Sequence, residues 1–282
     1  MTAVAIVPYG TDLRRGLGAV PLDALDWPLG RPERLRAGTV ADMARDDHLI
    51  TYPKTSLWAR RLPRCRVSLM VVEPRAIHAR HLTLSRIMGW RFHRILTRDE
   101  ATLRHLRNAR FFHCADTWIE APERLDTTKT AEVSLIASAK RDLEGHRLRH
   151  AVVEALPEGA PVDVMGRGYK PFEDKSDGLA PYRYSVVIEN SRERGYITEK
   201  LIDAVLCRTI PIYWGAPDVG DYLDTRGLII CETLDDILAA IDGADAAGYA
   251  ARAEAVEANH TAGRLLGDLH GRAARLILEE ET

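Results

Sequence analysis

Four polar side chains that could bind an anion and hydroxyl groups follow one short apolar segment in the second half of the chain. Residues 184–188 (YSVVI) form an apolar, β-branched run that predicts a buried strand. Asn190 comes two residues after this run, next to Glu189, and Tyr196, Glu199 and Lys200 follow a charged loop. An amide, a phenol, a carboxylate and an ammonium group at one strand–helix turn indicate a site for a negatively charged, hydroxyl-bearing ligand.

Lys200 stands where a helix would itself attract an anion. Thr198 is a favourable N-cap residue, and the apolar residues after it predict a helix over 199–207. A helix N-terminus carries partial positive charge, so a lysine in the first turn is mildly unfavourable unless an anion lies nearby. The alternative is that Lys200 is solvated and that Glu199 only complements the helix dipole.

Three segments of this half resemble the donor-binding domain of the α1,3/4-fucosyltransferases. They are residues 183–191 (RYSVVIENS), 196–201 (YITEKL) and 209–215 (TIPIYWG). The resemblance is specific because the motif is long and its internal spacing is fixed. It extends from about Lys129 to Glu232 and is faint before that. It implies an inverting, GDP-fucose-using enzyme with two facing Rossmann-like domains, the GT-B arrangement.

The resemblance also implies a role for each residue of the turn. Asn190, Tyr196, Glu199 and Lys200 match positions that the family uses on GDP-fucose. Lys200 would neutralise the pyrophosphate, and Glu199 and Tyr196 would hold ribose, phosphate or fucose oxygens.

A second cation is expected from the segment before this turn. Residues 134–149 resemble the family's strand–loop–helix that supplies a phosphate-binding arginine, which places Arg149 on that position and leaves Arg147 as the substitute. Two cations suit a leaving diphosphate, because its departure builds negative charge. The chain contains no Asp-x-Asp sequence, the metal–diphosphate device of the other common glycosyltransferase fold. We therefore expect no metal and no cofactor, with GDP-fucose as the donor substrate.

The predicted catalytic base is Glu73. An inverting transfer needs a carboxylate or histidine that takes the proton of the acceptor hydroxyl. Glu73 follows the apolar run 67–72 directly, as the family's base follows a strand, although Pro74 and Arg75 depart from the family's pattern. His78 is the fallback base, and a glutamate in an ordinary strand-end turn is the alternative.

Strand-like and helix-like segments alternate along most of the chain, which predicts an α/β fold with parallel sheets. The expected strands are residues 4–7, 48–52, 67–72, 93–97, 132–137, 162–165, 184–188, 209–214 and 228–230. The expected helices are residues 98–108, 146–156, 199–207 and 234–241, followed by a long Ala-rich helical tail over 244–280. In such sheets ligands bind at the carboxyl ends of the strands.

The polar stretch 120–130 is the expected linker between two domains. Residues 1–122 would form the acceptor-binding Rossmann-like domain and residues 123–282 the nucleotide-sugar domain. The final helix is placed in the second domain, with packing back on the first as the alternative.

Two further patterns only weakly indicate a metal site or a dinucleotide-binding site. His146, His150 and Glu154 share one helical face at metal-ligand spacing, but without a second element we expect a solvated face. Gly166 and Gly168 follow a strand without the third glycine of a dinucleotide fingerprint, so a tight turn is expected.

Composition excludes several classes of protein. The 282 residues are 46% hydrophobic and 28% charged, with a formal charge of −2, which argues against disorder and against a globally basic nucleic-acid binder. The four cysteines lie far apart and suit a reduced interior. The Arg-rich segment 60–66 is expected to be a solvated helix end or to touch an anionic surface, rather than to bind nucleic acid.

The sequence also bears on where the protein is expected to be located. The N-terminus shows no secretory signal, and no apolar stretch approaches the ~20 residues that span a bilayer. The expectation is a soluble, cytoplasmic protein with at most peripheral contact at the inner face of a membrane.

Together with these patterns, the resemblance implies a metal-independent inverting glycosyltransferase that moves fucose from GDP-fucose to a hydroxyl of a glycan or glycolipid. Three alternatives stay open: another nucleotide sugar on the same scaffold, a nucleotide-dependent oxidoreductase, and a non-catalytic nucleotide-sugar or glycan-binding protein. The sequence specifies neither the acceptor nor the oligomeric state.

Overall fold

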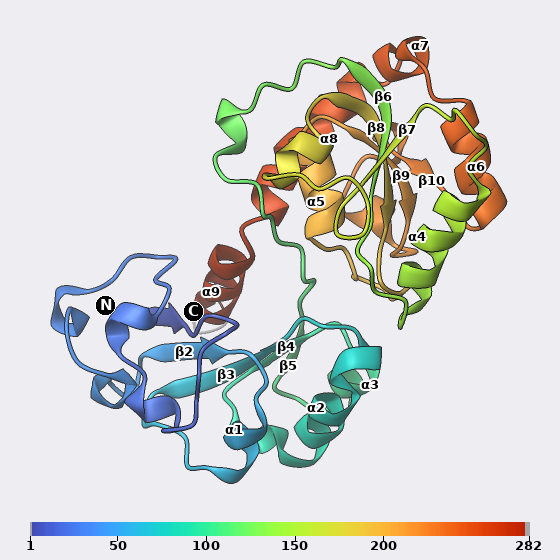
Figure 1. Cartoon of the computed structure of the whole chain (residues 1–282). Helices are drawn as coiled ribbons and strands as arrows, with labels where there is room; N and C mark the ends of the chain where they lie inside the picture. The colour runs from blue at the N-terminus through green and yellow to red at the C-terminus, as the bar shows by residue number, and fades with distance from the viewer. Residues whose placement is uncertain (1, 280–282) are drawn as a thin grey trace. The chain divides into compact units, whose positions relative to one another are not determined.

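The chain folds into two α/β units, each built on its own parallel five-stranded sheet (Figure 1). The computed structural model describes residues 2–279. Of the described residues, the N-terminal unit contains 2–113 and also 269–279, and the C-terminal unit is Cys114–Asp268. The predicted α/β class with two parallel sheets is therefore confirmed.

In the N-terminal unit the strands follow one another across the sheet in chain order. They are β1 (Val4–Ile6), β2 (His48–Thr51), β3 (Arg66–Val71), β4 (Ile95–Thr97) and β5 (Ala109–Phe111). All four pairings are parallel. The connections carry α1 (Thr55–Ala59), α2 (Arg75–Met88) and α3 (Glu100–His105), and four short 3-10 helices lie between residues 17 and 42.

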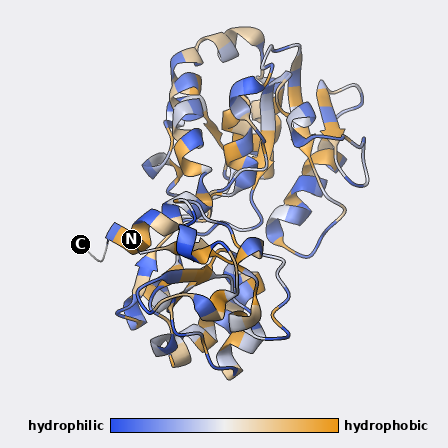
Figure 2. Ribbon diagram, turned by 90° about the vertical axis from the view of Figure 1, so that its left-hand side faces the viewer, coloured by the Kyte–Doolittle hydropathy of each residue, from blue (hydrophilic) through white to orange (hydrophobic). Residues whose placement is uncertain are grey.

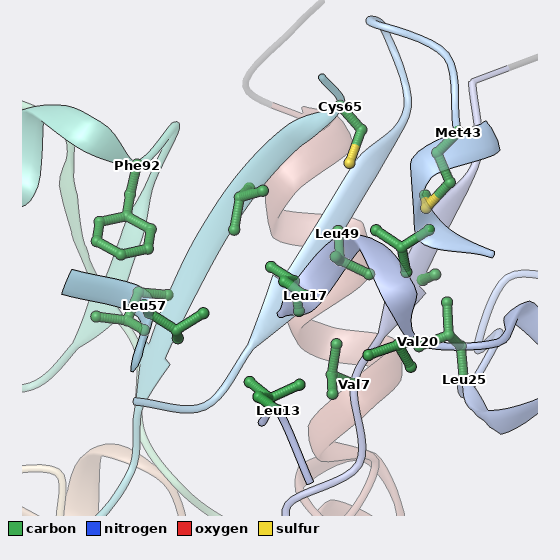
Figure 3. Packing of buried hydrophobic residues seen from close by; sticks show 14 of the residues in the cluster. Val7, Leu13, Leu17, Val20, Leu25, Met43, Leu49, Leu57, Cys65 and Phe92 are labelled. Atoms are coloured by element: carbon green, nitrogen blue, oxygen red, sulfur yellow. The ribbon is translucent and has the colours of Figure 1, made fainter. Parts of the chain in front are cut away.

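Alternate residues of these strands fill two separate cores, because successive side chains of a strand point to opposite faces. On one face Leu49, Val67 and Leu69 pack with Leu13 and Leu57, part of the cluster shown in Figure 3. On the other face Ile50, Met70 and Leu96 pack against the terminal helix α9 (Leu269–Glu279). Burial of this amphipathic helix explains why it groups with the N-terminal unit.

In the C-terminal unit the strand order is β10-β9-β8-β6-β7, again with parallel pairings throughout. The strands are β6 (Ala131–Ile136), β7 (Val162–Met165), β8 (Tyr182–Ile188), β9 (Ile210–Trp214) and β10 (Ile229–Ile230). From β6 the chain moves to one side, to β7, and from β8 it moves to the other, to β9. The carboxyl ends of β6 and β8 are thus the topological switch point of this sheet.

Helices cover both faces of this second sheet. One face packs against α4 (Glu144–Ala155) and α6 (Leu234–Asp242), and the other against α5 (Glu199–Leu206) and α8 (Ala253–Leu266) (Figure 1). Figure 2 shows the apolar strands inside this unit and polar residues on the outward side of its helices.

The structure corrects the expected boundary and the expected tail. The units divide at Cys114 rather than at residue 123, because Ala115 and Ile119 are buried in the C-terminal core and Cys114 Sγ donates to the Ile197 carbonyl. The expected tail helix is three helices, α7 (Ala246–Ala250), α8 and α9. Its last expected residue, Glu280, lies outside the described residues.

Most remaining elements appear where they were expected, within a few residues. The structure adds α1, α2 and β5, and α3 is shorter than the expected helix 98–108. All four cysteines are buried and free, in agreement with the expectation of a reduced interior.

Candidate functional site

The residues predicted to bind the donor meet at the switch point of the C-terminal sheet. Asn190 is the second residue after β8, Glu199 and Lys200 open α5, and Arg149 projects from α4, the helix after β6. The connections from neighbouring strands β6 and β8 leave in opposite directions, which opens the crevice where α/β sheets bind ligands.

The start of α5 is fixed by a buried carboxylate. Thr198 is the N-cap, and its Oγ1 accepts the Lys200 amide at 3.3 Å. The Thr198 amide and hydroxyl both donate to Glu189, at 2.9 and 2.7 Å, and Glu189 is fully buried. Burial raises the pKa of Glu189, and the nearby Lys200 ammonium opposes that rise. Glu189 therefore locks the end of β8 to the first turn of α5.

Lys200 is held inside this cluster rather than solvated. Its Nζ donates to Glu199 Oε1 at 2.9 Å and to Thr198 Oγ1 at 3.2 Å, and lies 3.7 Å from Glu189 Oε2. Only 24% of its side chain is exposed. Burial works to lower its pKa, but the two carboxylates outweigh burial and raise it, so the ammonium is charged at neutral pH. The solvated-lysine alternative is wrong.

Glu199 connects this ammonium to a second one. Lys175 Nζ lies 4.0 Å from Glu199 Oε1 and 2.7 Å from the buried Asp203. Burial alone would raise the pKa of Glu199, but Lys200 and Lys175 more than offset it and lower the pKa to about 2. Glu199 is consequently an ionised hydrogen-bond acceptor over the whole physiological range.

Arg149 is buried and aimed at the carboxyl end of β8. Its Nε donates to the Ile188 carbonyl at 3.0 Å, and its Nη2 donates to the same carbonyl and to Asn190 Oδ1 at 3.1 Å. Its Nη1 makes no hydrogen bond to another residue of 2–279, so two N–H donors of a buried guanidinium remain for a ligand. Burial lowers the pKa of Arg149, and Glu189 and Glu199 counteract this.

Arg149 lies in the middle of α4 and not at a helix start, so it acts through its side chain alone. What brings α4 close to β8 is Gly145. A Cβ on Gly145 would meet the Glu189 carbonyl oxygen at 1.7 Å, and its amide donates to the Asn190 carbonyl at 3.2 Å.

Tyr196 and Asn190 complete the group from the loop before α5. Asn190 Nδ2 donates to Tyr196 OH at 3.4 Å, and the Tyr196 side chain is almost fully buried. Arg192 in this loop pairs with Glu232 at 2.5 Å, and the Gly195 amide donates to Asp218 at 2.9 Å. The structure thus brings together all five residues predicted to bind the donor.

Two members of this cluster were not assigned from the sequence. Glu189 had a signal, since it is a carboxylate directly after an apolar strand. Lys175 had none, because a 3-10 helix (Lys175–Gly178) far along the chain carries it to Glu199 and Asp203.

The predicted base lies in the N-terminal unit. Glu73 is partly exposed in the turn between β3 and α2, and its charge contributes to the electrostatics of Tyr9. The fallback, His78, is buried at a non-helical point of α2. Burial, with His81 and Arg98 nearby, lowers the pKa of His78 to about 4, so its imidazole is neutral at pH 7.

The two weaker patterns have structural explanations. His146 and His150 are buried, which corrects the expectation of a solvated face; His146 contacts Asp142, and His150 contacts Tyr169 and the Lys140 carbonyl. Gly166 and Gly168 have φ of 111° and 104° and form the expected tight turn after β7.

No group of three or more His, Cys, Asp or Glu side chains within 2–279 is placed to hold a metal ion. No helix in the same part of the chain is long and apolar enough to cross a bilayer.

Comparison with known proteins agrees with the resemblance found in the sequence. Residues 127–233 match the family described as glycosyltransferase family 10 (fucosyltransferase), C-terminal part. This segment contains Arg149, Asn190, Tyr196, Glu199 and Lys200, and the expected resemblance to the fucosyltransferases is confirmed.

Individual relatives are similar over the same part. The α-(1,3)-fucosyltransferase FucT of Helicobacter pylori is 34% identical over 100 residues, which are 34% of this chain and 21% of that protein. α-(1,3)-Fucosyltransferase B of Drosophila melanogaster is 34% identical over 67 residues, 24% of this chain and 15% of that protein. The chain thus matches only about a fifth of the length of these relatives.

Solved structures share the fold. A crystal structure of an α1,3-fucosyltransferase with GDP-fucose aligns with a TM-score of 0.50 and 19% identity, over 74% of this chain and 69% of the other. TarM aligns with a TM-score of 0.50 and 12% identity, over 84% and 55%. At these identities the likeness shows the fold alone, and it confirms the GT-B class.

Gly145→Ala should disrupt the site at its base. The new methyl group cannot fit against the Glu189 carbonyl, so α4 must move away from β8, at a cost of about 1–3 kcal/mol in unfolding free energy. The matched control is Gly243→Ala at the end of α6, where a Cβ meets only Ala239 O at an ordinary 3.4 Å. Urea unfolding of both variants measures this, and equal stabilities would contradict the close approach.

Glu199→Gln should flatten the acid limb of the stability curve. The pKa of Glu199 is about 2 in the folded chain against 4.5 as its ordinary value, so its stabilisation is present above pH 4.5 and is lost as pH falls toward 2. The unfolding free energy of the variant should therefore fall less steeply over this range. Glu123→Gln, at an exposed site, is the control. Parallel curves for wild type and Glu199→Gln would refute the ionised, paired carboxylate.

Proposed function

We propose that this protein is an inverting glycosyltransferase that moves fucose from GDP-fucose to a hydroxyl of a glycan acceptor. The observation that carries the proposal is the buried Arg149 guanidinium, whose Nη1 donors are unused beside Asn190 and the start of α5. The same geometry lies inside the segment that matches the fucosyltransferase family, and a protein of the same fold was crystallised with GDP-fucose.

Arg149 and Lys200 would stabilise the leaving diphosphate. As the bond from fucose C1 to the phosphate oxygen breaks, negative charge grows on GDP, and preorganised cations lower the energy of that state more than the ground state. Arg149 is held rigidly by the Ile188 carbonyl, so little reorganisation is needed. In this proposal the two side chains provide charge neutralisation without a metal ion.

Lys200 would share its ammonium between protein and ligand. In the structure it already contacts Glu199 and Thr198, so a phosphate oxygen would take one of its three donors. Glu199 would then be free to accept a hydrogen bond from a ribose or fucose hydroxyl. Tyr196 and Asn190 would border the same ligand from the preceding loop.

Glu73 would act as the general base in the acceptor-binding unit. It would take the proton of the acceptor hydroxyl while the oxygen attacks fucose C1 from the face opposite GDP, which inverts the anomeric carbon. Its position in a turn at the carboxyl end of β3 suits this role. The acceptor would be a glycan or glycolipid, met in the cytoplasm or at the inner membrane face.

Two other functions use the same scaffold. The donor could carry another sugar, because the cluster recognises diphosphate and hydroxyl groups rather than one hexose. A thermal-shift series with GDP-fucose, GDP-mannose and UDP-sugars separates these donors, since bound ligand stabilises the fold. Detectable sugar transfer from any of them would exclude a non-catalytic binding protein.

Arg149→Ala and Lys200→Ala should each abolish transfer by weakening the donor complex. Loss of one charge-assisted contact corresponds to about a ten- to hundredfold weaker affinity for GDP, measurable by calorimetry. Arg147→Ala tests the substitute arginine: its side chain is exposed and donates to the nearby Asp142 carbonyl, so GDP affinity should stay within about twofold. Near-normal affinity in both Arg149→Ala and Lys200→Ala would remove the site.

Glu73→Gln should retain donor binding and lose turnover. Removing a general base lowers kcat by about 10²–10⁴-fold while leaving the diphosphate contacts in the other unit intact. The measurements are GDP affinity and the rate of fucose transfer, with His78→Asn assayed in parallel. Unchanged turnover in Glu73→Gln together with loss in His78→Asn would transfer the role to the histidine.

A further inference from the structure

A cavity of about 350 Å³, with charged side chains at its edge, lies in the N-terminal unit, where the proposed function needs an acceptor site. It is formed by the loop after β1 and by the segment that leads from β2 into α1, at the carboxyl end of the sheet. Its lining residues are Gly10, Thr11, Asp12, Leu13, Arg14, Lys54, Thr55, Ser56 and Arg60.

Both walls of this cavity are anchored to one core. Leu13 in the first wall and Leu57 in the second are buried in the same apolar cluster, which Figure 3 shows from close by. The first wall is further closed by turns, with the Thr11 amide on the Pro8 carbonyl at 3.1 Å and the Gly16 amide on the Leu13 carbonyl at 2.9 Å. The cavity is therefore preformed.

The charges of the lining do not balance. Arg14 is paired with Asp12, whose carboxylate accepts its Nε at 2.6 Å and its amide at 2.9 Å. Lys54 and Arg60 form no ion pair with a carboxylate in the described part of the chain. Arg60 donates instead to the Arg14 carbonyl, at 2.5 Å, which ties the second wall to the first. Two positive charges thus face a cavity without a counter-ion from the protein.

An aromatic ring and hydroxyl groups surround the same charges. Lys54 Nζ lies 5.8 Å from the centre of the Tyr9 ring, and Tyr9 is 51% exposed next to the lining loop. The Tyr9 ring also packs edge-on against the Tyr52 ring, with 5.0 Å between the two ring centres. Thr11, Thr55 and Ser56 add hydroxyl groups. An aromatic ring with hydroxyl groups nearby can bind a sugar through packing and hydrogen bonds. Cations that have no carboxylate partner can bind an acid group on that sugar.

We propose that this cavity binds an acidic sugar of the acceptor, with its carboxylate or phosphate on Lys54 and Arg60 and its ring beside Tyr9. The inference rests on the proposed function for its purpose, since it names the class of acceptor. Glu73 supports the placement: burial raises the pKa of Tyr9, and the Glu73 carboxylate raises it further, so the proposed base lies close enough to act on this ring electrostatically.

The test compares the full-length wild type with Lys54→Met and with the Lys54→Met, Arg60→Met double variant. The probes are immobilised oligosaccharides in matched pairs, each with a uronic acid or a sugar phosphate against the neutral hexose, at low and at high salt. Wild type should retain acidic members in preference to their neutral partners, and high salt should weaken that binding. Each lost cation should weaken it about tenfold, while binding to neutral members stays unchanged.

Arg61→Met and Arg64→Met are the matched controls, because both arginines are exposed in the same segment and do not line the cavity. The proposal would be overturned if the wild type bound acidic oligosaccharides no better than neutral ones. It would also be overturned if the double variant bound the acidic oligosaccharides as well as the wild type does. The proposal would also be overturned if the wild type bound anionic phospholipid vesicles through Lys54 and Arg60 but did not bind acidic sugars. That result would favour a membrane contact.

GDP affinity, measured on the same samples, should be unchanged, since no donor contact is altered. If the wild type did not bind GDP, the proposed function would be contradicted. The acidic-sugar binding would then be judged from the sugar measurements alone.

Discussion

The structure of the candidate site depends on one buried interaction, the hydrogen bonding of Arg149 to the Ile188 carbonyl at the end of β8. This contact joins the helix after β6 to the strand beside it, at the point where the chain departs in two directions. It is possible only because Gly145 lets α4 approach the backbone after β8. A guanidinium fixed in this way presents its remaining donors in one direction, as the proposed diphosphate site requires.

Cations and carboxylates alternate around Arg149 and shift one another's pKa values. Arg149, Lys200 and Lys175 lie among Glu189, Glu199 and Asp203, so each buried cation has a carboxylate nearby that offsets part of its desolvation. Two of the carboxylates serve distinct purposes. Glu189 is buried and orders the start of α5, whereas Glu199 is ionised at the edge of the site. A diphosphate that binds here would therefore meet cations already ordered by the protein.

Local patterns predicted most of the fold and the strand–helix turn of the donor cluster, whereas Arg149 was predicted from the resemblance to the fucosyltransferases. The strand run before Glu189 and the Thr198 cap determine where β8 ends and α5 begins, so Asn190, Glu199 and Lys200 could be placed from spacing alone. Long-range packing could not be read in this way. Lys175 reaches the site from a distant 3-10 helix, and Ala115 and Ile119 join the C-terminal core although they precede the polar linker. Helices α8 and α9 are both amphipathic, and packing against the second face of the first sheet explains why α9 belongs to the N-terminal unit.

A crystal structure with GDP bound tests the central claim most directly. The account predicts diphosphate oxygens within hydrogen-bonding distance of Arg149 Nη1 and Lys200 Nζ at the carboxyl ends of β6 and β8. A nucleotide bound elsewhere, or density for GDP absent at saturating concentration, would contradict it.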